Sequence, residues 1–320
     1  MPAAVAVLGI FVADLAFKAP RLPVMGETVL GHGFASGPGG KGSNQAIAAA
    51  RAGAEVRMIT RIGRDTFGEM ARQAWAADGV DTGAVSVDDA LPTGAAFIFV
   101  SIETGNNAII VESGAAAKLS PADVAAAEPA IAGAKVLVTQ FEQPVETAIA
   151  GLTLARRHGV ITILNPAPAV PADPAIYALC DYVTPNETEA ATLTGLRVES
   201  DAEALEAARA LLRMGARNAL ITLGEKGALL HGEAGTHFVP AFRVAQVVDT
   251  TGAGDAFNGG FAAALAEGRS PLDAIRFANA TAALSVQKPG TAPSMPTRAE
   301  IEALLGRAIV TADSGGTPAS

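Results

Sequence analysis

Short apolar runs rich in β-branched residues alternate with helix-like segments along most of this chain, and no other feature restricts its possible folds as strongly. A repeated strand–helix–strand order predicts a parallel sheet with helices on both faces. The predicted strands are Val5–Gly9, Val56–Thr60, Val136–Thr139, Ile161–Leu164, Tyr182–Thr184 and Ala219–Leu223. The predicted helices are Ser43–Ala52, Phe67–Asp78, Pro121–Ile131, Val145–Arg157 and Ala202–Met214.

Two segments interrupt this alternation. Thr28–Phe34 and Ala95–Val111 are predicted to be extended, the second with a turn at Glu103–Asn107. Together they could form a small sheet that stands off the main one and covers a site, where it would exclude water during a reaction. After Ala219 the predicted elements are strands at Ala228–His231 and Thr236–Val239, then helices at Ala253–Glu267 and Leu272–Val286.

The composition favours a metabolic enzyme. The 320 residues are enough for about two domains, although α/β chains of this size often form around one sheet. Half of the residues are hydrophobic and only 5% are aromatic, which argues against an adhesion module. The net charge of −9, without a cluster of lysines and arginines, argues against nucleic acid as a partner.

The single cysteine, Cys180, excludes an intramolecular disulfide and a zinc cluster, and it predicts a reducing compartment, the cytoplasm. The four histidines show no metal-ligand spacing. The apolar start Met1–Ile10 has no basic lead and is soon followed by Asp14, so we expect a buried first strand and neither a signal peptide nor a membrane helix.

The strongest local signal is the glycine-rich segment Asp249–Gly260, which runs into an alanine-rich helix. The N–H groups of Gly252, Ala253 and Gly254 can converge at the positive end of that helix and form an anion hole. Such donors stabilise the negative charge of a phosphoryl group in transit, and Asp255 beside them could accept the proton of an attacking hydroxyl. Alternatively, Asp255 only complements the helix dipole and the glycines only make the turn.

A second glycine-rich segment, Gly37–Gln45, opens a predicted helix. It matches the dinucleotide pattern G-x-G-x-x-G by letter, but it does not directly follow the first strand as that motif requires. It is not a P-loop either, because Gly42 follows Lys41 in place of Ser or Thr. Its glycines would let a small ligand approach the backbone, while Lys41 and Asn44 contact hydroxyls. The alternative is a flexible loop that caps the helix through Ser43.

Asn186 and Glu189 follow a predicted strand and lie three positions apart on one helical face. That spacing suits a hydrated Mg2+ near phosphates, and an N-cap with acidic residues in the first turn is the alternative. The segment Thr222–Gly227 also ends a strand, and it could be a nucleotide-contacting loop or an ordinary hairpin turn. Asp14 and Glu142 follow two further strands, so both are placed to bind hydroxyls at the carboxyl edge of the sheet.

These segments together resemble the ribokinase family of sugar kinases, from about Val5 to Arg307. Two motifs carry most of the resemblance: Gly-Gly-Lys-Gly-x-Asn-Gln at Gly39–Gln45 and Asp-Thr-x-Gly-Ala-Gly-Asp at Asp249–Asp255. Three further runs, in the matching order, resemble ribokinases more than distant relatives: Asn165–Pro168, Thr184–Glu189 and Ile221–Gly224.

The resemblance implies a three-layer α/β/α ribokinase-like fold with a mostly parallel central sheet and a small β-sheet lid. It implies a cytoplasmic, ATP-dependent carbohydrate kinase that forms a homodimer through the lid. The expected core comprises residues 1–12, 36–93 and 113–309, and the expected lid comprises residues 13–35 and 94–112. The small and polar residues at 310–320 predict a disordered tail.

The resemblance also implies roles for individual residues. The catalytic base is Asp255, with an anion hole at Gly252, Ala253 and Gly254. Sugar-contacting positions, besides Asp255, are Asp14, Gly39, Gly40, Lys41, Asn44 and Glu142. ATP-binding positions are Asn186, Thr222, Gly224, Lys226, Gly227 and Asn279, with Glu189 acting on Mg2+. The positions that match the loop around an activating K+ are Asp249, Thr251, Ser285, Lys288, Gly290 and Ser294.

One position departs from the family pattern. Ribokinases resemble each other in having Asn-x-Asp after the first strand, whereas this chain has Val12-Ala13-Asp14. Valine cannot hydrogen-bond a hydroxyl, and a site without that partner tolerates a deoxy analogue. We expect D-ribose, giving D-ribose 5-phosphate, first and 2-deoxyribose next, with another pentose, a nucleoside or a hexose left open. A non-catalytic sugar- or nucleotide-binding regulator is the rival, against which the intact Asp255 argues, because binding needs no base.

Overall fold

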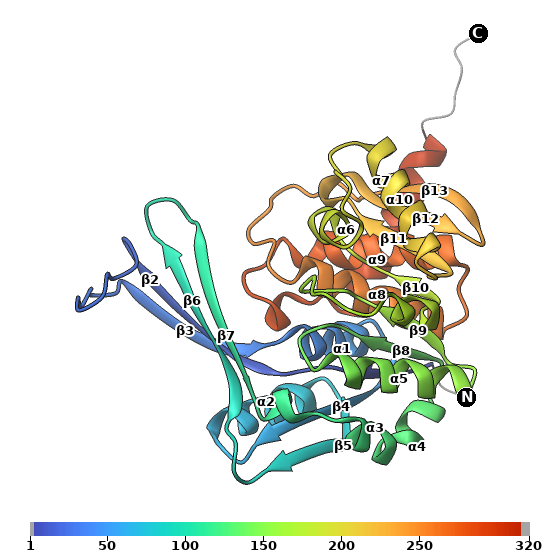
Figure 1. Ribbon diagram of the computed structural model, residues 1–320. Helices are drawn as coiled ribbons and strands as arrows, with labels where there is room; N and C mark the ends of the chain where they lie inside the picture. The colour runs from blue at the N-terminus through green and yellow to red at the C-terminus, as the bar shows by residue number, and fades with distance from the viewer. Residues whose placement is uncertain (1–2, 315–320) are drawn as a thin grey trace.

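A nine-stranded sheet forms the centre of the computed structural model, which describes residues 3–314 (Figure 1). The strand order across it is β13-β12-β11-β10-β9-β8-β1-β4-β5, and neighbouring strands are parallel from β11 through to β5. The hairpins β11–β12 and β12–β13 are antiparallel. The bounds are β1 Ala4–Leu8, β4 Glu55–Gly63, β5 Asp81–Asp88, β8 Val136–Thr139, β9 Ile161–Leu164, β10 Tyr182–Val183, β11 Asn218–Thr222, β12 Gly227–Gly232 and β13 Gly235–Pro240.

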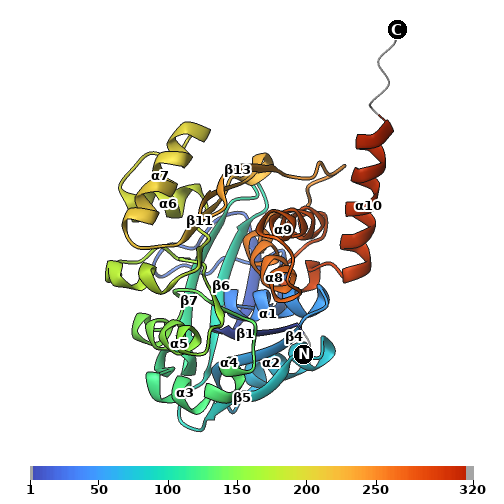
Figure 2. The same cartoon turned by 90° about the vertical axis from the view of Figure 1, so that its right-hand side faces the viewer.

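Helices cover both faces of this sheet, as Figures 1 and 2 show. The alternation of strands with amphipathic helices buries apolar side chains on each side, in separate clusters. One face carries α1 Lys41–Arg51, α2 Thr66–Ala77, α8 Ala253–Ala266, α9 Pro271–Ser285 and α10 Arg298–Ser314. The other carries α3 Pro121–Ala126, α4 Glu128–Ala132, α5 Val145–Arg157, α6 Glu187–Thr194 and α7 Asp201–Arg213. Short 3-10 turns lie at Ala115–Lys118, Pro174–Leu179, Gly224–Lys226 and Ala292–Ser294.

Small residues let α1 and α8 pack closely. A Cβ atom at Gly259 would lie 2.5 Å from the Cβ atom of Ala48, so only glycine fits there. In the same way, a Cβ atom at Gly42 would lie 2.7 Å from the Cα atom of Gly9, just after β1. These two close contacts hold the starts of α1 and α8 at the carboxyl edge of the sheet, where ligands bind in folds of this class.

A separate four-stranded sheet stands off the core as a lid (Figure 1). Its strand order is β3-β2-β6-β7, with β2 Val12–Ala19, β3 Gly33–Gly39, β6 Thr93–Ser101 and β7 Asn107–Gly114. The pairing register places Phe17 opposite Phe34 and Phe99, and the Phe17 and Phe34 ring centroids lie 4.9 Å apart. The lid therefore has an aromatic cluster of its own, while Val12 and Ala96 at its base pack against Ile10 and Ala116 of the core.

The fold class predicted from the sequence is confirmed, including the small sheet, but several element boundaries were wrong. The extended segment predicted at Thr28–Phe34 is irregular up to His32, and the strand spans Gly33–Gly39 instead. Its three glycines and Pro38 give it a low strand propensity, and pairing with β2 supplies the order that the local sequence lacks. Strands β2 and β5 were not predicted.

Proline and glycine positions explain two further differences. The helix predicted at Pro121–Ile131 is two helices that meet at Ala127, because Pro129 cannot continue the hydrogen bonding of the first. Helix α10 continues to Ser314, so residues 310–314 of the predicted disordered tail are helical, since no glycine or proline interrupts them before Gly315. The rest of that predicted tail lies outside the described residues. No helix between residues 3 and 314 has both the length and the apolar character needed to cross a membrane.

Candidate active site

The start of α8 forms a tight turn with a carboxylate beside it. Gly252 precedes the helix with a φ angle of +79°, a left-handed conformation that favours glycine. A Cβ atom at Gly252 would also lie 3.3 Å from Thr291 Cα, whereas one at Gly254 would meet nothing within 4 Å. The turn therefore lies at the positive end of α8 with open space at Gly254, where an anion can approach. The Ala253 N–H donates to the Thr250 carbonyl at 3.2 Å.

Asp255, in the first turn of α8, is only 6% exposed and is held by two amides from α1. Asn44 Nδ2 donates to Asp255 Oδ2 at 3.0 Å, and Gln45 Nε2 donates to Asp255 Oδ1 at 2.9 Å. Each carboxylate oxygen keeps a lone pair for a further donor. A buried carboxylate with one fixed partner on each oxygen can accept a proton from a hydroxyl brought next to it.

A cavity of about 150 Å3 opens beside Asp255. It joins the ends of β10 and β11 to the starts of α1, α6 and α8, so that segments far apart in the sequence share one surface. The predicted site residues that line it are Lys41, Asn186, Glu189, Thr222, Gly252, Gly254 and Asp255. Asn165, Ala167, Thr184 and Asn258 line it as well.

Charged groups around the cavity influence each other. Burial raises the pKa of Glu142 to about 7, although the nearby Lys41 charge and backbone N–H oppose the rise; that N–H donates to Glu142 Oε2 at 2.8 Å. Burial and the charge of Asp255 raise the pKa of Asp14 to about 6, against a smaller opposite effect of the Thr291 hydroxyl. The charge of Asp255, and more weakly those of Glu142 and Glu189, raise the pKa of Lys41 against the effect of burial. Lys41 is therefore a cation among these three carboxyl groups.

Asp14 lies in the lid strand β2 and not in a loop after the first strand. A Cβ atom at Gly39 would lie 2.3 Å from the Asp14 carboxyl carbon, so glycine leaves room for this side chain. Gly40 has a φ angle of +85° and passes against the backbone between Ile10 and Val12. Val12, the first residue of β2, is buried at the base of the lid with Ile10, Ala96 and Ala116. The lid thus contributes a carboxylate and an apolar surface near the start of α1.

Asn186 and Glu189 form a reciprocal capping box at the start of α6. Asn186 Oδ1 accepts from Glu189 N at 2.8 Å, and Glu189 Oε2 accepts from Asn186 N at 2.9 Å. The alternative interpretation of this pair as a helix cap is therefore correct, and the pair also lines the cavity. Burial raises the pKa of Glu189 despite that backbone hydrogen bond.

The remaining predicted ATP positions lie in the turn between β11 and β12 and on helix α9. Gly224 and Gly227 have φ angles of +53° and +116° in the turn that joins β11 to β12, so the alternative of a hairpin turn is also correct. Lys226 in this turn points to solvent, 3.6 Å from Asp201. Asn279 Nδ2 donates to the carbonyl groups of residues 239 and 240 at 3.1 Å, which joins α9 to the end of β13.

The positions predicted for K+ lie in two adjoining loops. Asp249 Oδ1 accepts from Thr251 N and Oδ2 from Gly290 N, both at 2.9 Å, and these bonds lower the pKa of Asp249 although burial opposes them. The hydroxyl groups of Ser285 and Ser294 donate to carbonyl oxygens of residues 282 and 291. Lys288 differs, because its ammonium group lies 2.8 Å from Glu300 on α10.

Three amide side chains near Asp255 were not predicted as site residues. Asn258 Nδ2 donates to the Gly254 carbonyl at 2.8 Å, and Asn258 Oδ1 accepts from Thr184 at 2.6 Å, so Asn258 supports the glycine turn. Gln45 and Asn165 contact each other at 3.0 Å next to Asp255. A sequence signal existed for Asn258, since it is the lone amide in a helix of small apolar residues that must be buried.

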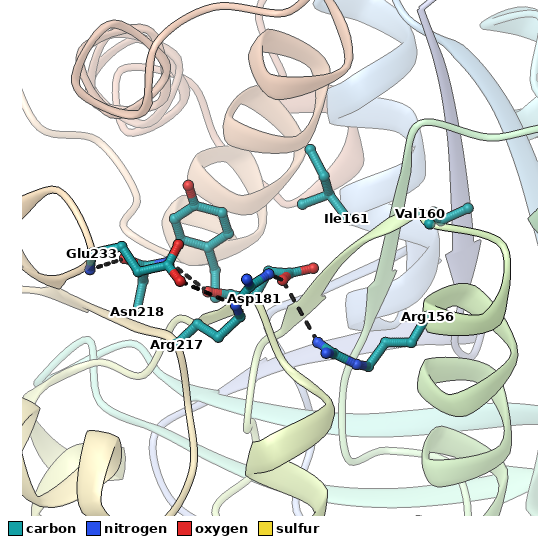
Figure 3. Close-up of a pocket in the computed structure, with 9 residues that line it drawn as sticks. Arg156, Val160, Ile161, Asp181, Arg217, Asn218 and Glu233 are labelled. Carbon is teal, nitrogen blue, oxygen red and sulfur yellow. Dashed lines mark hydrogen bonds and ion pairs between the residues drawn. The ribbon is translucent and has the colours of Figure 1, made fainter.

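A larger hollow of about 340 Å3 lies at the opposite, amino edge of the sheet (Figure 3). Figure 3 shows Asp181 among the residues that line it. Arg217 Nη1 donates to Asp181 Oδ1 at 2.7 Å. Asp181 Oδ2 also accepts from Thr162 N at 2.9 Å, and Arg217 Nε lies 3.2 Å from Glu233. These paired charges hold the starts of β9, β10 and β11 together. We interpret the hollow as a structural feature away from Asp255.

Comparison with known proteins identifies the family. A model of the pfkB family of carbohydrate kinases matches residues 2–298. This chain belongs to that family. The expected enzyme class, a sugar kinase that uses ATP, is thereby confirmed.

Relatives of this kinase include ribokinases and deoxyribokinases. It is 41% identical to the ribokinase of Haemophilus influenzae over 294 residues, covering 92% of this chain and 95% of the relative. It is 38% identical to the deoxyribokinase of Salmonella typhi over 293 residues, covering 91% and 95%. Its structure resembles that of Arabidopsis thaliana ribokinase complexed with ribose and ATP, with a TM-score of 0.89, 32% identity, and coverage of 95% and 98%. The ribokinase-like fold expected from the sequence is therefore confirmed.

Proposed function

We propose that this kinase transfers the γ-phosphoryl group of ATP to the 5-hydroxyl of a pentose, with D-ribose as first candidate and 2-deoxyribose as second. The observation that carries the proposal is the buried Asp255 carboxylate, fixed by Asn44 and Gln45 beside the glycine turn of α8. Binding alone needs no base in such a position, which argues against a non-catalytic regulator.

The reaction uses this geometry in one displacement. Asp255 accepts the proton of the sugar hydroxyl as the hydroxyl oxygen bonds to the γ-phosphorus. The bond from the γ-phosphorus to the bridging oxygen of ADP breaks, and ADP leaves with that electron pair. The N–H groups of Gly252, Ala253 and Gly254 stabilise the charge on the transferring phosphoryl oxygens. Lys41 adds a positive charge on the same side of the cavity.

We place the sugar between the lid and the start of α1. Asp14, Asn44 and Glu142 offer acceptors to its hydroxyl groups, and Lys41 offers donors. The Asn44 amide supports this placement: its Nδ2 donates to Asp255, whereas its Oδ1 is buried and has no partner among the described residues. A buried acceptor of this kind costs stability until a donor reaches it, and a sugar hydroxyl would be that donor.

Ribose and deoxyribose differ by one hydroxyl group, and we propose that Val12 lies near its position in the bound sugar. Among the relatives named above are a ribokinase and a deoxyribokinase, at 41% and 38% identity, so similarity alone does not choose between these sugars. Val12 is buried against the lid and offers no hydrogen bond, which favours some activity on deoxyribose.

We propose that ATP lies over α6 and the β11–β12 turn, where Asn186, Thr222 and Gly224 face the nucleotide. Gly227, Lys226 and Asn279 would adjoin the same binding surface. Mg2+ would enter with the phosphates, because the described residues include no group of three or more His, Cys, Asp or Glu side chains placed to hold a metal. Glu189 Oε2 is engaged by Asn186, which leaves Oε1 for a water molecule of the hydrated ion.

We propose a K+ site in the loops at 249–251 and 285–294. The support is their direct connection, since Val248 N and Asp249 N both donate to the Val286 carbonyl, at 2.8 and 3.2 Å. K+ is bound by oxygen ligands. These loops offer such oxygen atoms in their carbonyl groups and in the side chains of Asp249, Thr251, Ser285 and Ser294. K+ there would fix the shape of the adjoining Gly252 turn, while Lys288 and Gly290 hold the second loop.

We further propose that two copies meet through their lids in the cytoplasm. One lid face carries Phe17, Phe34 and Ile110, with Phe34 61% and Ile110 69% exposed. An exposed apolar face of a small sheet is stabilised when another surface covers it. In a two-fold symmetric dimer the same lid face of each copy would cover the other. The lid, over residues 12–39 and 93–114, would be a distinct unit from the core.

A sugar panel tests the main proposal. ADP release is measured with ATP, Mg2+ and each of several pentoses, nucleosides and hexoses, with and without K+. We expect pentose-dependent ADP release that is absent in the Asp255→Asn variant. Absence of release with every sugar, from protein that is folded by circular dichroism, would overturn it.

A further inference from the structure

We propose that Gln140 and Gln45 form a directional chain of amides that positions Asp255 for proton transfer. Both are positioning residues, because neither touches the substrate in the arrangement proposed above. The inference rests on the proposed role of Asp255 as the base and adds how that base is held. The chain begins at Gln140, just after β8, and reaches Asp255 through Gln45 on α1.

The contacts are short and fully buried. Gln140 Nε2 donates to Gln45 Oε1 at 2.7 Å, and Gln45 Nε2 donates to Asp255 Oδ1 at 2.9 Å. The side chains of Gln140 and Gln45 are both 0% exposed, so no solvent competes for these bonds. A Cβ atom at Gly9 would lie 2.2 Å from Gln140 Oε1, which shows that the end of β1 makes room for this amide.

The contacts of Asn165 and Gln45 allow one orientation of each amide, whereas Gln140 Oε1 is buried without a partner among the described residues. Asn165 Nδ2 donates to the Thr184 carbonyl at 3.0 Å, so Asn165 Oδ1 must face Gln45. Gln45 Nε2 then faces two acceptors, Asn165 Oδ1 and Asp255 Oδ1, and its Oε1 faces Gln140. If Gln45 turned over, its oxygen would face both acceptors without a hydrogen atom between them. Asn165 and Asp255 therefore fix the orientation of Gln45, and the Gln140 N–H holds the Gln45 Oε1 atom at the far end of the same amide.

The consequence is a base whose direction is set before the sugar binds. With Oδ1 held by Gln45 and Oδ2 by Asn44, the carboxylate plane of Asp255 cannot rotate freely. Proton transfer needs the acceptor oxygen within hydrogen-bond reach of the hydroxyl, and small displacements lower its rate strongly. Gln140 thus acts on turnover and not on sugar binding.

The Gln140→Met variant tests this, because methionine keeps the shape and removes the N–H donor. We expect kcat to fall by about 10-fold or more, while KM for the sugar changes by less than about two-fold. Thr162→Val is the matched control: Thr162 is also 0% exposed and loses a 2.7 Å hydrogen bond to the Leu179 carbonyl, but it lies at the opposite edge of the sheet. It should lose stability and keep its kcat.

A second variant, Gln140→Glu, tests the role of the N–H donor through the pH dependence of kcat, which a purely structural role of Gln140 would not change. In Gln140→Glu the introduced carboxyl group can donate to Gln45 Oε1 only when it is protonated, and burial favours that form. The kcat of this variant relative to the unchanged protein should therefore rise as the pH is lowered from 8 to 6. This ratio also decides the question if Gln140→Met does not fold.

The outcomes separate the two claims. Unchanged kcat in folded Gln140→Met, or a Gln140→Glu ratio that is flat with pH, would overturn the amide chain and leave the kinase assignment standing. Activity that survives in Asp255→Asn would instead remove the base itself, and with it the proposed function on which the chain rests.

Discussion

The side-chain amide of Asn44 donates a 3.0 Å hydrogen bond to the carboxylate of Asp255, which lies 211 residues further along the chain. The bond joins the two glycine-rich segments through the close packing of α1 on α8, where Gly259 contacts Ala48. Asn44, which we propose binds the sugar, therefore contacts Asp255, which we propose activates the sugar hydroxyl. The proposed sugar-binding and catalytic groups are therefore in direct contact, so substitutions of Asn44 and Asp255 should have non-additive effects.

Replacing Asp255 by asparagine should lower kcat by on the order of 10²-fold or more, because the amide keeps the shape but cannot take the proton. Sugar-dependent ADP release measures the effect. The rise in melting temperature that sugar causes should remain in the variant, which shows that it still binds. Near-normal turnover would remove Asp255 as the base.

The Val12→Asn variant should raise the ratio of kcat/KM for ribose over deoxyribose by about 10-fold or more, because the introduced amide can bond a hydroxyl that deoxyribose lacks. Without sugar, the variant should lose about 1–3 kcal/mol of stability, since the new polar group is buried among apolar side chains. Kinetics on both sugars and thermal unfolding measure these effects. Val12→Ala is the control, and an equal sugar ratio in all three proteins would show that this position does not set specificity.

Removing the carboxylate of Asp14 should stabilise the sugar-free protein while it weakens activity. Burial raises the pKa of Asp14 from 3.8 to about 6, so the folded state binds this proton more tightly than the unfolded state does. The ionised group therefore costs stability, fully above about pH 6 and not at all below the unfolded value of 3.8. Asp14→Asn should gain about 1–3 kcal/mol at pH 8, and the gain should vanish toward pH 4.

Thermal unfolding between pH 4 and pH 8 measures this gain, and the KM for the sugar should rise in the same variant. The control is Asp89→Asn, whose carboxylate is 74% exposed beside Arg64 and should show no such pH-dependent gain. A constant stability difference across the pH range would contradict the burial of a charged Asp14.

Phe34→Glu should convert a dimer to a monomer, because a charge would enter the apolar lid face that we expect a second copy to cover. Light scattering coupled to gel filtration gives the mass directly. Phe238→Glu is the matched control, since Phe238 is 42% exposed on β13, away from the lid. A monomeric unchanged protein would exclude the lid dimer.

K+ should increase the turnover of the unchanged protein at constant ionic strength, and Asp249→Ala should abolish the increase. Asp249 accepts from both Thr251 N and Gly290 N, so its loss would separate the two loops. Initial rates in K+ and in choline measure the effect. An equal response to K+ in both proteins would place the ion, or its effect, elsewhere.

Local patterns in the sequence determined a large part of this protein. The alternation of strands and helices gave the parallel sheet, because side-chain periodicity fixes which faces are buried. The segments Gly39–Gln45 and Asp249–Asp255 identified the family and the proposed base, because a tight turn at a helix start needs glycine and a carboxylate at fixed spacing. Residue types and short spacings were sufficient for these conclusions.

The tertiary structure alone decided which side chains meet. Strand β3 is ordered by pairing with β2, and Asp14 on the lid is close enough to Asp255 for its charge to act. Local sequence propensity predicts neither of these contacts. The pairs Gln140–Gln45 and Gln45–Asp255 span 95 and 210 residues, so no local pattern predicts them. Such contacts depend on how closely α1, α8 and the ends of β1 and β8 pack, and that distance is set by glycine and alanine contacts between elements remote in sequence.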